Sequence, residues 1–114
     1  MVVTQGEVYW VDLRRPTGSE PGYKRPCVVV QGALFNASNI QTVVVCATTS
    51  NLNRALSPGN VLLQKGEANL PKKSVVNITQ MLTLTRSALG PKIGTLSQQR
   101  IKDIVAGVQL LIRM

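Results

Sequence analysis

Histidine is absent from this chain of 114 residues, and acidic residues are scarce, with five aspartates and glutamates against thirteen lysines and arginines. Without histidine, the chain can form neither a Ser-His-Asp nor a Cys-His catalytic arrangement, nor a metal site with imidazole ligands. Five carboxylates are few for the cluster that a two-metal nuclease requires. Glycine-rich loops of the GxGxxG or Walker type are also missing, which argues against a nucleotide cofactor. We therefore expect neither a metal ion nor a cofactor.

Long apolar runs are missing as well. No window is uncharged and apolar over the length that a membrane helix needs, and the N-terminus lacks the basic and apolar segments of a signal peptide. We expect a cytoplasmic protein that does not associate with a membrane. The length fits one domain, residues 1–114, and leaves little room for a second core.

Cysteine is represented by two residues, Cys27 and Cys46, and both lie within apolar, strand-like runs. Free cysteine is among the most buried residue types, so packing in the core is the favoured interpretation. A disulfide is an alternative if the two strands are neighbours, although nothing else in the sequence indicates an oxidising compartment. Two cysteines without histidine cannot form the usual zinc site of four ligands.

The excess of basic residues gives a net charge of +8. Such an excess attracts polyanions over long distances and speeds their association. The basic residues are scattered rather than packed into one tract, which is not typical of a nucleic-acid-binding tail. On charge alone, nucleic acid is a somewhat better candidate partner than no polyanion at all.

Short β-branched and apolar runs, separated by turn formers, predict a sheet over most of the chain. Strands are expected at 7–13, 26–31, 42–49, 61–64, 74–78, 81–85 and 92–95. Residues 14–22 are expected to form a long loop, and a helical turn is possible within 32–39. The sequence Ser57-Pro58-Gly59-Asn60 is a turn signature that closes the loop at 51–59.

The last segment has a helical rather than a strand-like pattern. Its apolar residues follow the helical period, and Ser97 precedes the segment as a good N-cap. They are Ile101, Ile104, Val105, Val108, Leu111 and Ile112. Gly107 weakens the helix interior by about 1 kcal/mol relative to alanine, so packing on the sheet must hold the helix. We expect a mainly β fold, a small curled sheet or barrel with a C-terminal helix.

Two strand ends carry the polar residues that suggest a site. Arg25 and Pro26 stand directly before the apolar run at 27–31, and Pro26 can occupy a strand's first position, where a missing N–H matters little. Thr48-Thr49-Ser50-Asn51 ends the second such run. If the two ends meet, a guanidinium and hydroxyl groups form one site, for which phosphate is the natural ligand.

Such a site suits the cleavage of RNA, which carries its own nucleophile in the 2′-OH group. Arginine donates two parallel hydrogen bonds to phosphate oxygens. Threonine hydroxyl and backbone N–H groups can complete an oxyanion site, at about 3 kcal/mol for each preorganised donor. Arginine is a poor proton acceptor because it stays ionised, so Glu20 is the candidate for taking the 2′-OH proton. On sequence alone, a solvated loop glutamate is the favoured interpretation of Glu20.

Several segments occur in an order that is itself informative. They are Gly6-Glu7-Val8-Tyr9-Trp10-Val11-Asp12-Leu13, Gly18-Ser19-Glu20, Lys24-Arg25-Pro26-Cys27-Val28-Val29-Val30-Gln31, Thr48-Thr49-Ser50-Asn51, Ser74-Val75-Val76-Asn77 with Gln80, and Lys92-Ile93-Gly94-Thr95-Leu96. Together they resemble the MazF/PemK/Kid family of toxin endoribonucleases from type II toxin–antitoxin systems. The resemblance spans nearly the whole chain, and the first three segments in this order are specific.

The resemblance implies an SH3-like small barrel with a C-terminal helix and a homodimer. It also implies metal-independent, sequence-specific cleavage of single-stranded RNA, which leaves a 2′,3′-cyclic phosphate or 3′-phosphate and a 5′-hydroxyl and inhibits translation and growth. A cognate, MazE-like antitoxin is implied as a partner. Its acidic disordered segment would suit the basic surface and block the RNA groove.

The resemblance also assigns the site. The catalytic arginine of the family falls on Arg25, its catalytic threonine on Thr49, with Thr48 as the alternative, and its glutamate on Glu20, which binds substrate or transfers a proton. The residues expected to bind substrate are Ser19, Lys24, Thr48, Ser50, Asn51 and Gln80, of which Gln80 matches a position implicated in base contact. Many relatives carry a cation two residues after that glutamine, whereas this chain has Leu82, which leaves the cleavage sequence open.

Two other functions stay open. One is a gyrase-binding toxin that resembles CcdB, which shares the fold superfamily and relies on a C-terminal helix ending in aromatic and hydrophobic contacts. The end of this chain, 110–114, has no aromatic residue, which counts against it. The other is a basic SH3-like module that binds nucleic acid, with a steep dependence on salt, and does not cleave it.

Two further features have more than one interpretation. Tyr9 and Trp10 face opposite sides of their strand, so one is expected in the core while the other can stack on a base or contact a second subunit. Lys72 and Lys73 are interpreted as a solvated pair in a loop, with phosphate contact as the minority interpretation.

Overall fold

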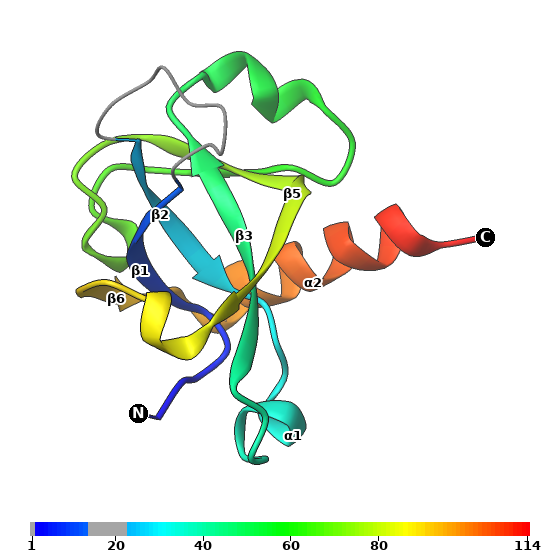
Figure 1. The fold of residues 1–114 in the computed structure, drawn as a ribbon. Coiled ribbons are helices and arrows are strands. Elements are labelled where there is room, and N and C mark those ends of the chain that lie inside the picture. The colour runs from blue at the N-terminus through cyan, green and yellow to red at the C-terminus, as the bar shows by residue number, and fades with distance from the viewer. Residues whose placement is uncertain (1, 14–22) are drawn as a thin grey trace.

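A curled antiparallel sheet of six strands carries the fold in the computed structural model, which describes residues 2–13 and 23–114 (Figure 1). The strands lie in the order β4-β5-β3-β2-β1-β6. Their bounds are β1 (Glu7–Asp12), β2 (Lys24–Val29), β3 (Thr42–Thr49), β4 (Val61–Leu63), β5 (Ser74–Thr85) and β6 (Lys92–Thr95). Helix α2 (Gln98–Ile112) follows the sheet, and the expected mainly β class with a C-terminal helix is confirmed.

Shorter helical elements connect the strands. Helix α1 (Ala33–Asn36) fills the segment where a helical turn was possible, and it lies at the end of the molecule away from η1 (Figure 1). The three 3₁₀ turns are η1 (Leu52–Leu56), η2 (Glu67–Asn69) and η3 (Arg86–Ala88). The turn that closes the loop after η1 is confirmed, because Asn60 N–H donates to the Ser57 carbonyl at 3.2 Å and Gly59 has φ of +79°.

Strand β2 begins two residues earlier than expected, so Pro26 lies inside it and the prediction that Pro26 starts the strand is wrong. Pro26 is paired with Trp10 of β1. The backbone N–H and carbonyl of Trp10 point away from β2. The carbonyl accepts from Gly90 N–H at 2.8 Å, and the N–H donates to the Pro91 carbonyl at 3.0 Å. The pair therefore needs no hydrogen bond from residue 26, and proline is tolerated there.

Strand β5 is one continuous element, so the prediction of separate strands at 74–78 and 81–85 is wrong. Its pairing with β3 shifts register between Cys46 and Thr48, opposite Met81 and Val76. Ile78 N–H in this irregular stretch donates to Asn60 Oδ1 at 2.9 Å, just before the start of β4. The polar residues at 79–80 mark a bulge at which the strand bends, rather than a gap between two strands.

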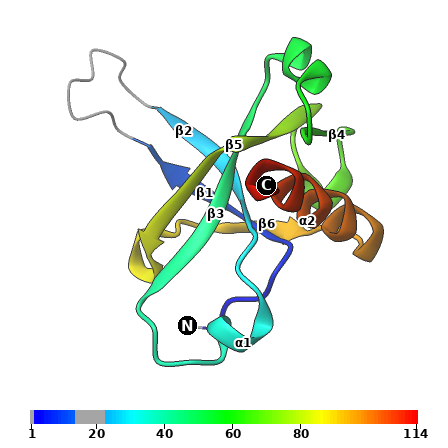
Figure 2. The same ribbon diagram turned by 90° about the vertical axis from the view of Figure 1, so that its right-hand side faces the viewer.

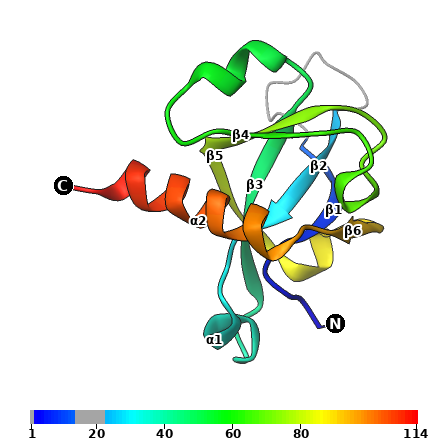
Figure 3. The same cartoon turned by 180° about the vertical axis from the view of Figure 1, so that it is seen from behind.

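Helix α2 crosses the sheet beside β4 and β5 (Figures 2 and 3). Ser97 is its N-cap and accepts from Arg100 N–H at 3.3 Å, as predicted. The apolar stripe is buried only in part, because the last turn projects beyond the sheet and Ile112 is 68% exposed. None of the helices in the described part of the chain has the length and apolar character that crossing a membrane requires.

The sheet has a dry cluster on each face. One cluster, which includes Val8 and Cys46, packs beneath α2, and the other includes Tyr9 and Cys27. Both cysteines are free and buried, as core packing predicts, and their membership of different clusters excludes the alternative of a disulfide. Burial raises the pKa of the Cys27 thiol to about 12 and that of Cys46 to about 11.

Glu7 at the start of β1 is a buried carboxylate with a full set of partners. It accepts from Thr4 N–H at 2.7 Å and Tyr9 OH at 2.9 Å, and it pairs with Lys92 Nζ at 2.8 Å. Burial raises the pKa of Glu7, but the bonds from Lys92, Thr4 and Tyr9 outweigh it, so the pKa lies below its usual value. The carboxylate therefore stabilises the fold above its unfolded pKa, and this contribution is lost as pH falls through the folded value.

Gly107 of α2 meets the backbone of Gly59, and this contact generates a prediction with an unusual sign. An alanine Cβ at 107 would overlap the Gly59 carbonyl oxygen and lie 3.0 Å from Ile78 Cγ1. Gly→Ala in a helix interior normally stabilises by about 1 kcal/mol. We expect Gly107→Ala to destabilise instead, by about 2 kcal/mol, because the helix must move off the sheet.

Urea unfolding followed by circular dichroism measures this free energy. Gln109→Ala, at an exposed position of the same helix, is the control and should change stability by no more than about 0.5 kcal/mol. A Gly107→Ala protein as stable as the parent would show that the glycine contact does not hold the helix.

Candidate active site

A cleft of about 360 Å³ lies where β2 begins and β3 ends. These two strand ends lie at the same end of the sheet (Figure 1). Among the described residues that line the cleft, three are cationic, three carry aliphatic hydroxyl groups and two are aromatic. They are Lys24, Arg25 and Lys72, then Thr48, Ser50 and Ser74, then Trp10 and Tyr23, and none of the described lining residues is acidic.

The register of the sheet positions Arg25. Because Cys27 pairs with Ala47, the next residues of β2 towards its start come to lie beside Thr48. Arg25 Nη1 donates to the Thr48 carbonyl at 3.1 Å, across the two strands. The guanidinium carbon also lies 4.6 Å from the centre of the Tyr23 ring. A carbonyl and an aromatic face thus hold the arginine in place. The sequence argument predicted that the two strand ends meet, but not these two contacts.

The charge of Arg25 is not neutralised by these contacts. Within the described residues no carboxylate forms an ion pair with it, and Lys24 and Lys72 line the same cleft. The guanidinium Nε and Nη2 atoms donate to no other described group. A positively charged cleft with unused arginine donors is suited to a phosphate group.

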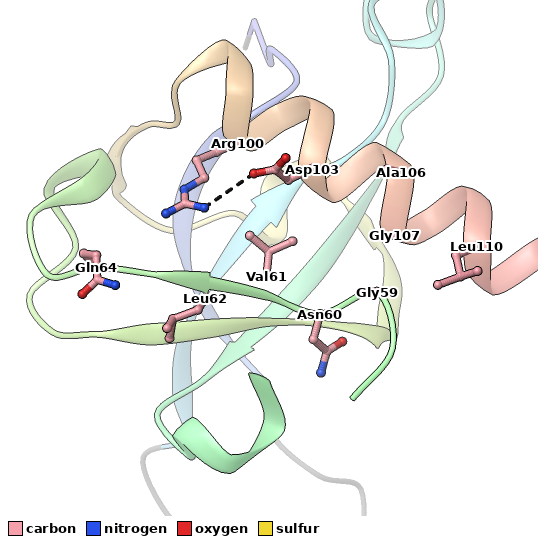
Figure 4. Close-up of a pocket in the computed structure, with 10 residues that line it drawn as sticks. All are labelled: Gly59, Asn60, Val61, Leu62, Gln64, Arg100, Asp103, Ala106, Gly107 and Leu110. Carbon is pink, nitrogen blue, oxygen red and sulfur yellow. Dashed lines mark hydrogen bonds and ion pairs between the residues drawn. The ribbon is translucent and has the colours of Figure 1, made fainter. Parts of the chain in front are cut away.

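Arg100 provides a contrast within the same molecule. It lines a larger pocket of about 550 Å³ between β4 and α2 (Figure 4). Its Nε and Nη2 atoms donate to the two carboxylate oxygens of Glu67 at 2.9 and 3.1 Å, and Nη1 reaches Asp103 at 3.5 Å. The hydrogen bond from Arg100 holds the pKa of Glu67 below its usual value.

Two carboxylates therefore neutralise Arg100, and its pocket shares no lining residue with the Arg25 cleft. Asn60, Leu62 and Leu110 form much of the remaining wall of that pocket (Figure 4). Arg100 joins η2 to α2 and has a structural role. The larger of the two pockets is thus the less suitable one for an anion.

The two candidate threonines differ in their surroundings. Thr48 lines the cleft with Arg25, and its buried hydroxyl donates to the Pro26 carbonyl at 2.8 Å. Thr49 is half-buried and is not among the lining residues, and its hydroxyl accepts from Asn51 N–H at 3.1 Å. The contacts therefore bring Thr48 and Arg25 together and leave Thr49 at the start of the next turn.

Of the other residues predicted to bind substrate, some line the cleft and others do not. Lys24 and Ser50 line the cleft, whereas the exposed Asn51 caps η1 by accepting from Asn53 N–H at 3.2 Å. Gln80 is exposed on β5 and is not among the lining residues. Ser19 and Glu20 lie outside the described residues. Leu82, at the position where many relatives have a cation, packs against one of the two core clusters.

Six described lining residues were not among the predicted site residues: Trp10, Tyr23, Pro26, Pro71, Lys72 and Ser74. Base stacking was an open interpretation for Trp10, and phosphate contact was the minority interpretation for Lys72. Alternation along β1 signals Trp10 once Tyr9 is known to be buried, because neighbouring residues face opposite sides. Trp10 and Lys24 also line an adjoining, more apolar cleft of about 530 Å³. Nothing in the local sequence signals Tyr23, whereas Lys72 belongs to the basic loop pair for which phosphate contact was the minority interpretation.

Within residues 2–13 and 23–114, no group of three or more histidine, cysteine, aspartate or glutamate side chains is placed to hold a metal ion.

Comparison with known proteins places the chain in a family. Residues 4–112 match the model of a family described as PemK-like, MazF-like toxin of type II toxin–antitoxin system. The chain is 38% identical over 109 residues to endoribonuclease MazF6 of Mycobacterium tuberculosis, an alignment that covers 96% of each chain. The family match favours the ribonuclease over the gyrase-binding alternative.

Solved structures show the same fold. MazF from Deinococcus radiodurans superimposes with a TM-score of 0.76 at 23% identity, covering 100% of this chain and 99% of that chain. An endoribonuclease in complex with its cognate antitoxin, from mycobacterial species, superimposes with a TM-score of 0.71 at 19% identity, covering 96% and 91%.

Proposed function

This chain belongs to the family of PemK-like, MazF-like toxins of type II toxin–antitoxin systems and is an endoribonuclease toxin, and we propose that it cleaves single-stranded RNA in the Arg25 cleft without a metal ion. We locate cleavage in this cleft because of the Arg25 guanidinium. It is not paired with a described carboxylate, it has two unused donor atoms, and two lysines line the same cleft. The scarcity of carboxylates and the lack of histidine support chemistry that does not use a metal.

Cleavage proceeds by attack of the ribose 2′-oxygen on the adjacent phosphorus. A bond forms from that oxygen to phosphorus, the bond to the 5′-oxygen breaks, and a 2′,3′-cyclic phosphate and a 5′-hydroxyl result. Arg25 donates Nε and Nη2 to the phosphate oxygens and stabilises the extra negative charge of the phosphorane. Lys24 and Lys72 attract the chain of phosphates to the cleft.

Proton transfer requires a group other than arginine, which stays ionised. We propose Glu20 for this step: its carboxylate accepts the 2′-OH proton, and the departing 5′-oxygen takes a proton from solvent water to become the 5′-hydroxyl. We propose Thr49 as the hydroxyl donor beside the phosphate, with Thr48 as the alternative. The Thr49 hydroxyl accepts from Asn51 N–H and keeps its own proton for a ligand, whereas the buried Thr48 hydroxyl donates its proton to the Pro26 carbonyl. The remaining residues proposed to bind substrate are Ser19, Ser50, Asn51 and Gln80, and Trp10 offers an aromatic face on which a base can stack.

Removal of the Arg25 guanidinium should abolish cleavage. We expect the parent protein to cut an unstructured RNA pool in EDTA, and Arg25→Ala to cut at least about 100-fold more slowly, as for the loss of a preorganised transition-state donor. Gel analysis of RNA fragments gives the rates, and mapping of the cut ends gives the end chemistry and the cleavage sequence.

Arg100→Ala is the control that is matched in charge. It removes the same positive charge away from the cleft, so it should lower the thermal midpoint by breaking the pair with Glu67 while RNA is still cut. A folded Arg25→Ala protein with full activity would refute the site assignment. Equal losses in both variants would indicate that overall charge matters and not the position of Arg25.

The choice between the two threonines can be tested with isosteric variants. Thr49→Val should slow cleavage by about 100-fold because it removes a hydroxyl donor whose proton no described group accepts, whereas Thr48→Val should change the rate by no more than about threefold. Thr49→Ser keeps a hydroxyl group and should recover most of the rate. The reverse order of the two valine variants would assign the catalytic hydroxyl to Thr48.

We also propose the partners of this toxin. An acidic, disordered antitoxin segment suits the net charge of +8, and the exposed apolar end of α2 supports a homodimer. Residues 1–114 would form one toxin domain that acts in the cytoplasm. If the antitoxin lies across the RNA groove, the antitoxin segment and an RNA oligonucleotide should compete for binding to the protein. Tight binding of both at once would contradict a shared groove. Light scattering should separately give the mass of a dimer.

A further inference from the structure

Tyr23 lines the proposed active site but has no role in the mechanism described above. It stands directly before β2 and lines the same cleft as Arg25. Its ring lies beneath the guanidinium, with the Arg25 Cζ atom 4.6 Å from the ring centre. This distance is within the range in which an aromatic face attracts a cation.

The backbone holds the ring in this place. Leu13 N–H donates to the Tyr23 carbonyl at 2.8 Å, which extends the pairing of β1 and β2 by one step beyond Asp12 and Lys24. The ring is therefore attached to a strand end and not only to the adjoining loop. Its placement is set by the same sheet that positions Arg25.

The Thr48 carbonyl alone does not fix the guanidinium. One hydrogen bond from Nη1 restrains one end of the group, and the plane can still turn about that bond. Bidentate phosphate binding requires the plane and its remaining donors to point in one direction. The Tyr23 face supplies the second restraint, and it does so without the charge neutralisation that a carboxylate brings to Arg100.

We propose that Tyr23 is a positioning residue, whose aromatic face orients the Arg25 guanidinium for the phosphate undergoing attack. The inference rests on the proposed role of Arg25 in RNA cleavage. Tyr23 itself need not touch the reacting atoms. Its effect should appear in the chemical step more than in binding, because RNA is also held by the other cations of the cleft.

Steady-state kinetics can separate these effects. The substrate is an oligoribonucleotide with one mapped cleavage site between a fluorophore and a quencher. Tyr23→Leu keeps an apolar side chain but loses the ring, and it should lower kcat by about five- to tenfold with KM within about twofold. Tyr23→Phe keeps the face and should hold kcat within about twofold. Adding Tyr23→Leu to Arg25→Ala should cause no further loss.

Controls make the outcomes unambiguous. Phe35→Leu removes an exposed aromatic ring from α1 and should leave both constants unchanged. Circular dichroism reports whether each variant folds, and Tyr23→Met replaces the leucine variant if that one does not. Parental kcat in Tyr23→Leu would overturn the inference. An equal loss in Tyr23→Phe would also overturn it, because the hydroxyl group and not the face would then matter.

A spectroscopic measurement tests the inference apart from catalysis. The Nε–H signal of Arg25, assigned by its absence in Arg25→Ala, should show a high heteronuclear NOE in the parent and in Tyr23→Phe, and a lower one in Tyr23→Leu. An unchanged NOE in Tyr23→Leu would overturn the proposed orientation. If the parent protein does not cleave RNA at all, the proposed function fails, whereas this result still decides whether Tyr23 orders Arg25.

Discussion

An arginine can grip a phosphate only if the protein holds its guanidinium without neutralising it. Arg25 meets this requirement, because a backbone carbonyl and an aromatic face hold it and no described carboxylate pairs with it. Arg100 fails it, because Glu67 and Asp103 take up its donors. The same side chain thus has a proposed binding role in one cleft and a structural role in the other, and its partners determine which.

The pairing of the strands brings the residues of the proposed site together. Arg25 and Thr48 are 23 positions apart, and the pairing of Cys27 with Ala47 brings them together. The pair depends on the register of two central strands, because a slip of one residue would turn their side chains to the opposite faces. The dry clusters on both faces of the sheet fix that register, so the core contributes to the chemistry without touching substrate.

Sequence patterns predicted most of the strands and the C-terminal helix. They failed where contacts between residues far apart in the sequence determine the structure. The alternation and turn signals predicted β3, β6 and α2 almost to the residue, because their periods and caps are local. They divided β5 at its bulge, since only pairing with β3 and Asn60 shows that the strand continues. They also led to the prediction of Arg25 at a strand end, but no local rule separates Thr48 from Thr49, because two adjacent threonines at a strand end differ only in the face they present.

Tyr23 and Lys72 show the limit from another side. Tyr23 stands directly before β2 and Lys72 lies in a loop, and no local rule relates position 23 to a guanidinium plane or position 72 to β2. Both residues line a cleft in which cations that are to bind phosphate must not be paired with carboxylates of the protein. Aromatic faces and carbonyls are the protein groups that can order a cation and leave its charge available. In a chain with five acidic residues, such partners are the natural support for the arginine that does the binding.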